Sequence, residues 1–142
     1  MLNKLKRAAL GAHTPHDKAT AASKPVPMPL PAQVRILMSQ HIGAPAKALV
    51  KKGDEVFVGT KIGEAGGFVS ANIHSSVSGT VAAVEPFRLS NGRTCDSVVI
   101  KTDGKQTVDP AVQPPVVTDK ASFMAAVREC GLVGLGGAGF PT

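Results

Sequence analysis

The sequence predicts a mainly β protein that is followed by one α-helix and a glycine-rich segment. Between residues 34 and 107, short β-rich runs alternate with turn signals that contain glycine or asparagine. Residues 119–130 carry apolar side chains at helical spacing, and glycines cluster after them, between residues 134 and 139. Eleven prolines and fifteen glycines among 142 residues limit what can pack, so we expect one ordinary domain with tails.

Residues 1–33 are predicted to form an extended, proline-rich arm. Every second residue from Pro25 to Pro31 is proline, which excludes a helix and favours a polyproline-like path. Earlier in the arm, His13 and His16 lie three residues apart. A metal site is one interpretation of this pair. A polar turn against a neighbouring domain is the favoured one, because no cysteine or further ligand lies nearby.

Residues 34–107 are predicted to form an all-β module. Several short strands joined by close turns are typical of a small barrel or sandwich. Asn91-Gly92 is the strongest hairpin signal, because both residues tolerate the backbone conformation that a tight turn needs. The β-rich runs are Val34–Met38, Thr80–Val84 and Val98–Ile100, and the other turn signals are Gly53-Asp54, Gly59, Gly66-Gly67 and Ser78-Gly79.

Residues 108–118 are predicted to be a linker stiffened by prolines, and residues 119–142 a helix with a glycine-rich loop. Thr118 or Asp119 can cap the helix, and Gly131 stands where a terminating glycine belongs. We expect the apolar stripe of the helix to be core, packed on a surface beyond residue 142, and the cysteine in it to be a buried free thiol. The stripe consists of Phe123, Ala126, Val127 and Cys130.

Composition argues against several classes of function. The net charge of +6 is spread along the chain, and there is no Trp or Tyr, so stacking on nucleic acid is not expected; a basic surface, solvated or facing an acidic partner, is favoured. No apolar run is long enough for a membrane span. Cys95 and Cys130 are far apart without a CxxC spacing, so they provide neither a metal site nor an iron–sulfur site.

The β module resembles the biotinyl and lipoyl carrier domains, which have the barrel-sandwich hybrid fold. The two half-motifs are VKKGDEV from Val50, with Gly59 after it, and IHSSVSGTV from Ile73. Carrier domains present a lysine five residues before that isoleucine; here the position is Phe68, and residues 63–78 contain no lysine. The resemblance therefore implies the fold without the carrier chemistry. An exposed Phe68 could dock on a partner, and a packed turn is the equal alternative.

No catalytic residue is assigned from the sequence. His74, Ser75 and Ser76 offer a base beside hydroxyl groups, but no acidic residue stands at a position that would orient the base. Neighbouring residues of a strand also point to opposite faces. We therefore expect no nucleophilic catalysis here.

Taken together, the segments resemble the RnfC family, the C subunits of Rnf-type electron transport complexes. The resemblance is carried by the GAHTPHDK arm, the alternating prolines, QHIGAPAKALVKKGDEV, GFVSANIHSSVSG and the final GLVGLGGAGFPT. It covers residues 11–142 and identifies the chain as the N-terminal portion of an RnfC-like subunit of a membrane-associated, ion-translocating ferredoxin:NAD oxidoreductase complex. It implies other subunits of the complex as partners, NAD(H) as a ligand of the parent, and a peripheral location on the cytoplasmic face of the bacterial inner membrane.

The same resemblance implies that the glycine loop opens an α/β domain that binds flavin and NADH. The loop is also similar to GRGGAGFPTG of the complex I flavoprotein subunit, with Leu135 in place of the arginine. The parent would carry FMN, NAD(H) and two [4Fe-4S] clusters, the latter on cysteine motifs nearer its C-terminus. The cofactor-binding residues implied are Gly134, Gly136, Gly137, Ala138, Gly139 and Phe140.

For the 142-residue piece itself we expect no bound cofactor, no metal and no redox activity, because a flavin needs a ring pocket and a cluster needs four thiolates. The enzyme would be the parent. The alternative is a stand-alone barrel-sandwich module that binds a protein partner and has no redox role. The coupling ion, Na⁺ or H⁺, is left open by the residues.

Overall fold

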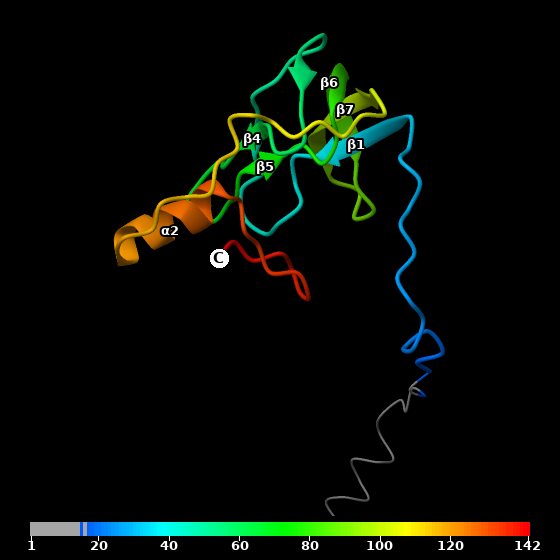
Figure 1. Ribbon diagram of the computed structural model, residues 1–142, viewed down its shortest axis with the longest axis horizontal. Helices are drawn as coiled ribbons and strands as arrows, with labels where there is room; N and C mark the ends of the chain where they lie inside the picture. Colours follow the sequence, from blue (N-terminus) through cyan, green and yellow to red (C-terminus); the bar gives the residue numbers. More distant parts are fainter. Residues whose placement is uncertain (1–14, 16) are drawn as a thin grey trace, which may run out of the picture.

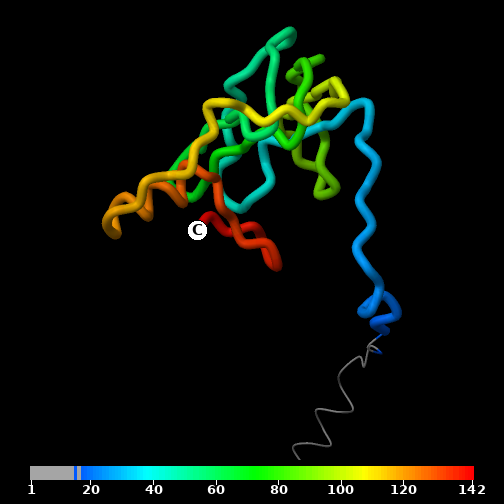
Figure 2. The backbone as a smooth tube through the Cα atoms, in the orientation of Figure 1, coloured from blue at the N-terminus to red at the C-terminus, as the bar shows by residue number. Residues whose placement is uncertain are grey.

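The structure is a computed structural model that describes residue 15 and residues 17–142 (Figures 1 and 2). His13 and His16, with the metal-site interpretation attached to them, lie outside the described residues. Two antiparallel sheets form the body, one with the strand order β1-β7-β6-β3 and one with the order β2-β4-β5. The strands are β1 Gln33–Leu37, β2 Lys47–Ala48, β3 Glu55–Val56, β4 Lys61–Glu64, β5 Ile73–His74, β6 Gly79–Arg88 and β7 Thr94–Thr102.

The hydrophobic core lies between the two sheets. Met38, Ile62 and Ile100 are completely buried. Met38 follows directly after β1, Ile62 lies in β4 and Ile100 lies in β7. Burial of one such side chain contributes about 1.5–3 kcal/mol. The core joins Ile62 and Ile73 of the smaller sheet to Val81 and Ile100 of the larger one. The predicted mainly β fold is therefore confirmed.

The long hairpin of β6 and β7 is the backbone of the larger sheet. Its loop contains Asn91-Gly92, as predicted, with Gly92 at φ +80°. The side-chain oxygen of Asn91 accepts the backbone N–H of Arg93 at 3.0 Å, and the Leu89 N–H donates to the Arg93 carbonyl at 2.7 Å. Gly92 adopts this left-handed backbone without a steric penalty, which allows the loop to close the hairpin.

The described part of the arm leaves the sheets and extends away from them (Figure 1). Residues 23–31 carry neither helix nor strand, in keeping with the alternating prolines, whose nitrogens cannot donate hydrogen bonds. The arm meets the body at its end, where the Thr102 hydroxyl donates to the Pro31 carbonyl at 2.7 Å. The arm boundary near residue 33 remains a prediction.

The first residues of the predicted linker pair with the β body. Val58 donates to the Thr107 carbonyl and accepts from Asp109 N–H, both at 2.9 Å, and it forms a parallel bridge with Val108. The side chain of Asp109 also accepts a hydrogen bond from the Thr60 hydroxyl. Residues 107–109 are thus attached to the body, and Val112 also lies against it, next to Gly59.

The predicted helix is present as α2, Lys120–Glu129. Of the two candidate caps, Asp119 is the one used: its carboxylate accepts the Ser122 N–H at 2.8 Å, forming a capping box. Gly131, at φ +64°, ends the helix in a Schellman motif, in which its N–H donates to Arg128 and the Leu132 N–H to Val127.

The apolar stripe of α2 is not covered by the described residues. No residue of the helix is buried, and Phe123 is 56% exposed, so packing of the stripe on a surface beyond residue 142 stays a prediction. The prediction for the cysteine of the stripe is wrong, because Cys130 is exposed and Cys95 is the buried cysteine. Periodicity gives the apolar face of a helix without saying what covers it.

Candidate functional site

The glycine-rich segment folds into a closed loop beside α2. The Gly134 N–H donates to the Phe140 carbonyl at 2.8 Å, and the Thr142 N–H donates to the Leu132 carbonyl at 3.0 Å. An antiparallel bridge joins Val133 to Pro141 between these bonds. Residues 134–140 therefore form one loop whose two ends are held together by the backbone, which fixes the position of its tip.

Gly139 attaches this loop to the β body. It is buried and has φ +67°, and a Cβ placed on it would lie 2.9 Å from the Gln40 carbonyl oxygen and 3.1 Å from the His41 Cα. Its own carbonyl accepts the Ile42 N–H at 3.4 Å. A glycine is needed at this position because both the backbone conformation and the close approach of residues 40–41 exclude a side chain.

Gly136 and Gly137 have a different environment from Gly139. No atom lies within 4 Å of a Cβ built on either residue, and neither requires a positive φ. In the described structure, the N–H groups of residues 135–138 have no backbone partner, and the neighbouring Leu135 is fully exposed. The tip of the loop thus offers a bare backbone on which a ligand can lie, and no contact among the described residues explains the missing side chains.

His41 lies next to the glycine loop, at Gly139. The Ala71 N–H donates to its Nε2 at 3.2 Å, so Nε2 is the unprotonated nitrogen and Nδ1 carries the proton, which faces the Ile42 carbonyl at 3.0 Å. This buried side chain therefore connects the strand exit at residues 41–42 to the hairpin between β4 and β5. The QHIGAP sequence contained His41, but nothing in its pattern identified this role.

An apolar groove of about 480 Å³ lies next to the loop. One wall is the hairpin tip with Phe68, the second is α2, and the third is formed by residues 131–132 and 140–142. Phe68 is 91% exposed, which decides between the two interpretations of the tip: it is not a packed turn. Three of the five phenylalanines of the chain line this groove, namely Phe68, Phe123 and Phe140.

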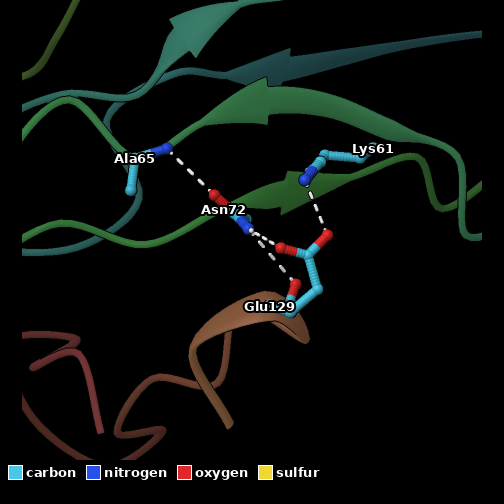
Figure 3. A network of polar contacts seen from close by, with 4 residues as sticks. All are labelled: Lys61, Ala65, Asn72 and Glu129. Carbon is cyan, nitrogen blue, oxygen red and sulfur yellow. Dashed lines mark hydrogen bonds and ion pairs between the residues drawn. The ribbon is translucent and has the colours of Figure 1, made fainter. Parts of the chain in front are cut away.

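A polar network fixes the wall formed by α2 to the wall formed by the hairpin (Figure 3). The Asn72 side chain accepts the Ala65 N–H at 3.0 Å and donates to the Glu129 backbone carbonyl at 3.3 Å and carboxylate at 3.1 Å. Lys61 pairs with the same carboxylate at 2.6 Å. Because Ala65 leaves β4 and Asn72 leads into β5, the C-terminal end of α2 is fixed to the base of the hairpin.

A second, more polar hollow lies on the other side of the network. It is lined by Lys61, His74, Asp109, Glu129 and Cys130, among others. Burial lowers the pKa of His74, an effect that the Glu129 carboxylate opposes and the Lys61 ammonium group reinforces. Ser75 is buried and its hydroxyl donates to the Val77 carbonyl at 2.7 Å, so His74 and Ser75 do not form a nucleophile and base.

Across the described residues, no group of three or more His, Cys, Asp or Glu side chains could hold a metal ion. None of the helices found there is long and apolar enough to cross a membrane. The six residues implied as a cofactor site, Gly134, Gly136, Gly137, Ala138, Gly139 and Phe140, all lie on the one closed loop. Their binding role is carried further below as a proposal.

Comparison with known proteins gives the same assignment for most of the chain. The family model of the RnfC barrel sandwich hybrid domain matches residues 6–105. The C subunit of the Na(+)-translocating ferredoxin:NAD(+) oxidoreductase complex of Acetobacterium woodii is 46% identical over 136 residues, which are 93% of this chain and 31% of that protein. The proton-translocating counterpart of Clostridium ljungdahlii is 38% identical, covering 92% of this chain and 30% of that protein.

A more distant relative extends the comparison to another bacterium. The C subunit of the ion-translocating oxidoreductase complex of Rhodobacter capsulatus is 37% identical over 132 residues, which are 89% of this chain and 25% of that protein. The chain therefore spans between a quarter and a third of the length of these relatives.

Proposed function

Since the chain belongs to the RnfC barrel-sandwich hybrid family, we propose that it works as the N-terminal part of the RnfC subunit in an Rnf-type, ion-translocating ferredoxin:NAD oxidoreductase complex. The family match and the three relatives support this assignment. Two of the relatives are named for different coupling ions, Na⁺ and H⁺, so the proposal concerns the oxidoreductase and not the ion.

We further propose that the closed loop of residues 134–140 forms one wall of a flavin and NADH site. The observation that carries this is the open backbone at Gly136 and Gly137, which have nothing within 4 Å of a Cβ position. Free N–H groups on a glycine-rich turn are suited to phosphate oxygens, which they can approach closely and hydrogen-bond. Leu135, where the complex I loop has arginine, supplies no positive charge, so the backbone would carry the phosphate contact.

In this proposal each part of the chain has a separate task. Gly139 and His41 hold the loop on the β body, while Gly136 and Gly137 present the bare backbone to the cofactor. A flavin, when bound, accepts the hydride of NADH. Phe140, 59% exposed beside the loop, provides an apolar surface against which a ring can lie. The iron–sulfur clusters would be held by other parts of the protein, because neither Cys95 nor Cys130 belongs to a cluster motif.

The partners in this proposal are the other subunits of the complex and NAD(H). The relatives are named as subunits of an ion-translocating complex, and we propose peripheral attachment of this subunit at the cytoplasmic face of the membrane, through those partners. The 142-residue chain alone would then be redox-inert, since it contains only one wall of the cofactor site.

The test uses the full-length RnfC subunit in its complex, with Gly136→Val and Gly137→Val as separate variants. A valine at either position adds bulk on the side that faces the ligand without touching the fold, so flavin content or NADH-dependent reduction should fall at least about tenfold, which is about 1.4 kcal/mol. Gly92→Asn is the matched control, because Gly92 also has open space around it and asparagine tolerates its positive φ.

In the 142-residue chain, which is expected to bind no cofactor, the thermal unfolding midpoint should be the same with either valine as without it. If both variants keep full flavin content and full NADH turnover, the loop is not a cofactor wall. The alternative is a module that binds a protein partner and has no redox role, and the exposed apolar groove would be its binding surface. That alternative would be supported if the natural complex, isolated by means of this chain, contained no bound flavin and did not oxidise NADH.

A further inference from the structure

The groove between the hairpin tip and α2 exposes several large apolar side chains. Phe68 is 91% exposed, Met124 61% and Phe123 56%, and all three line the same hollow. Large exposed apolar side chains that gather in one hollow favour an interaction site, because leaving them in water costs free energy. The groove is therefore expected to be covered in the working protein.

The walls of the groove are fixed in place before anything binds. Gly131 packs so tightly against the Asn72 carbonyl oxygen that a Cβ on it would overlap that atom, and Asn72 is in turn hydrogen-bonded to Ala65 and Glu129. Arg128 donates to the Gly67 carbonyl at 3.3 Å, from the helix to the hairpin tip. A preformed site of this kind binds its occupant without a large ordering cost.

The character of the lining indicates a permanent contact. Of all the residues that line the groove, Arg128 is the one with a charged side chain. Interfaces that form and separate are more polar, whereas permanent interfaces resemble a domain core that has been cut in half. The large side chains here, three phenylalanines, a methionine and a leucine, have the composition of such a core.

We propose that this groove is filled by an apolar face of the same polypeptide, formed by the part of the protein that follows the glycine loop. This rests on the proposed assignment to a longer RnfC subunit. Two observations select this occupant over a separate protein. The aligned region is at most 31% of the relatives described above, so these proteins have a large amount of further chain. Pro141 and Thr142 themselves line the groove, so a chain that continues there starts from its wall.

The hairpin tip acquires a new role in this arrangement. In carrier domains, the same tip presents a lysine that carries a cofactor, whereas this chain has Phe68 at that position. When Phe68 packs against the following domain, the barrel-sandwich module fixes the position of the glycine loop relative to the rest of its cofactor site. The tip would then act as an anchor between two domains of one protein.

The test measures how fast a cysteine introduced at one position reacts with a maleimide, followed at the peptide that carries it, because the full-length subunit is expected to contain cluster cysteines as well. The background is the full-length RnfC subunit with Cys130→Ser, because Cys130 is exposed, while Cys95 is buried. Ala125→Cys is the main probe, since it lines the groove and removes no apolar contact; Phe68→Cys is the second probe. Val116→Cys is the matched control, at an exposed linker position (82%) that is not part of the groove.

In the isolated full-length protein, without any partner subunit, Ala125→Cys and Phe68→Cys should react at least about tenfold more slowly than Val116→Cys, because a covered site reacts only when it opens. Reaction of Ala125→Cys at the control rate would overturn the proposal. Protection that appears only after the other subunits are added would overturn it as well, since the occupant would then be a separate protein. NADH and flavin do not enter the readout, so protected groove cysteines in a protein without NADH turnover would refute the proposed function alone.

Discussion

The β body and the C-terminal region of this chain differ in how they are stabilised. The body buries Met38, Ile62 and Ile100 completely between two sheets, so its stability comes from its own side chains. The region from 119 to 142 has a well-capped helix and a closed loop, yet no residue of α2 is buried. The lesson is that local hydrogen bonds can define a helix and a loop, while the free energy that holds them in place comes from surfaces outside them.

The largest expected difference between the regions is the response to truncation of an apolar side chain. Ile100→Ala in the body should lower the free energy of unfolding by about 2–5 kcal/mol, because it removes buried surface and leaves a cavity. Phe123→Ala on α2 should cost less than about 0.5 kcal/mol in the 142-residue chain, because Phe123 is already mostly in water. Urea denaturation of both variants measures this, and equal losses would remove the distinction between the regions.

The attachment of α2 to the body can be broken at one backbone position. Gly131→Ala should cost about 2 kcal/mol, because alanine is strained at φ +64° and its Cβ would overlap the Asn72 carbonyl oxygen. Gly136→Ala is the matched control from the same segment, with open space around it, and should leave stability unchanged. Thermal unfolding checks both variants. A tolerated Gly131→Ala would mean that α2 is not held against the hairpin.

The polar network should contribute less than the glycine contact. Asn72→Ala removes the acceptor of the partly buried Ala65 N–H and the donor to Glu129, and leaving such a donor without a partner costs about 1–2 kcal/mol. Lys61→Gln removes only the partly exposed ion pair with Glu129, which is worth about 0–1 kcal/mol. Urea titrations should place the two variants in this order, and the Lys61→Gln effect should shrink at high salt. The reverse order would mean that the Lys61–Glu129 ion pair, and not the hydrogen bonds of Asn72, attaches α2 to the body.

The smallest expected effect is the dependence of α2 on pH. The backbone hydrogen bond from Ser122, and then that from its side chain, lower the pKa of Asp119 below the ordinary 3.8. A carboxylate whose pKa is lower in the folded state stabilises the helix fully above the ordinary value, and this stabilisation is lost as the pH falls through the lowered pKa.

The Ser122 amide, followed by NMR, should therefore lose its hydrogen bond only at acid pH. Asp119→Asn is the control, because asparagine also caps a helix but does not titrate in this range. If the Ser122 signal of the two proteins changed identically with pH, the cap would not be the titrating group.

Much of the fold could be predicted because it is encoded locally. Asn91-Gly92 at the β6–β7 turn, Gly131 after the helix and the runs that became β1, β6 and β7 each follow from the conformations that their own residues allow. The choice of Asp119 over Thr118 as the cap needed the structure, since both are good capping residues. The carrier-like fold with Phe68 in place of a lysine was also readable, and the RnfC family model confirms the fold.

The contacts that build the candidate site could not be predicted, because they join residues far apart in the sequence. Asn72 meets Glu129, and Gly139 meets His41 (Figure 3 shows the first of these contacts); neither pair has a spacing that marks it. Only the family resemblance points to the six glycine-loop residues, and the structure divides them by environment: Gly139 is required by the fold, while Gly136 and Gly137 are not. That division makes the binding proposal specific to the loop tip.

Amide hydrogen exchange tests most directly the claim that the β body is complete in itself while α2 and the glycine loop are completed by further chain. The rates would be compared between the 142-residue chain and the full-length RnfC subunit. We predict that amides in the paired parts of β6 and β7 exchange equally slowly in both proteins, while amides of residues 123–129 exchange at least about tenfold faster in the shorter one. Equal rates for α2 in the two proteins would show that nothing beyond residue 142 covers it, and would contradict the account.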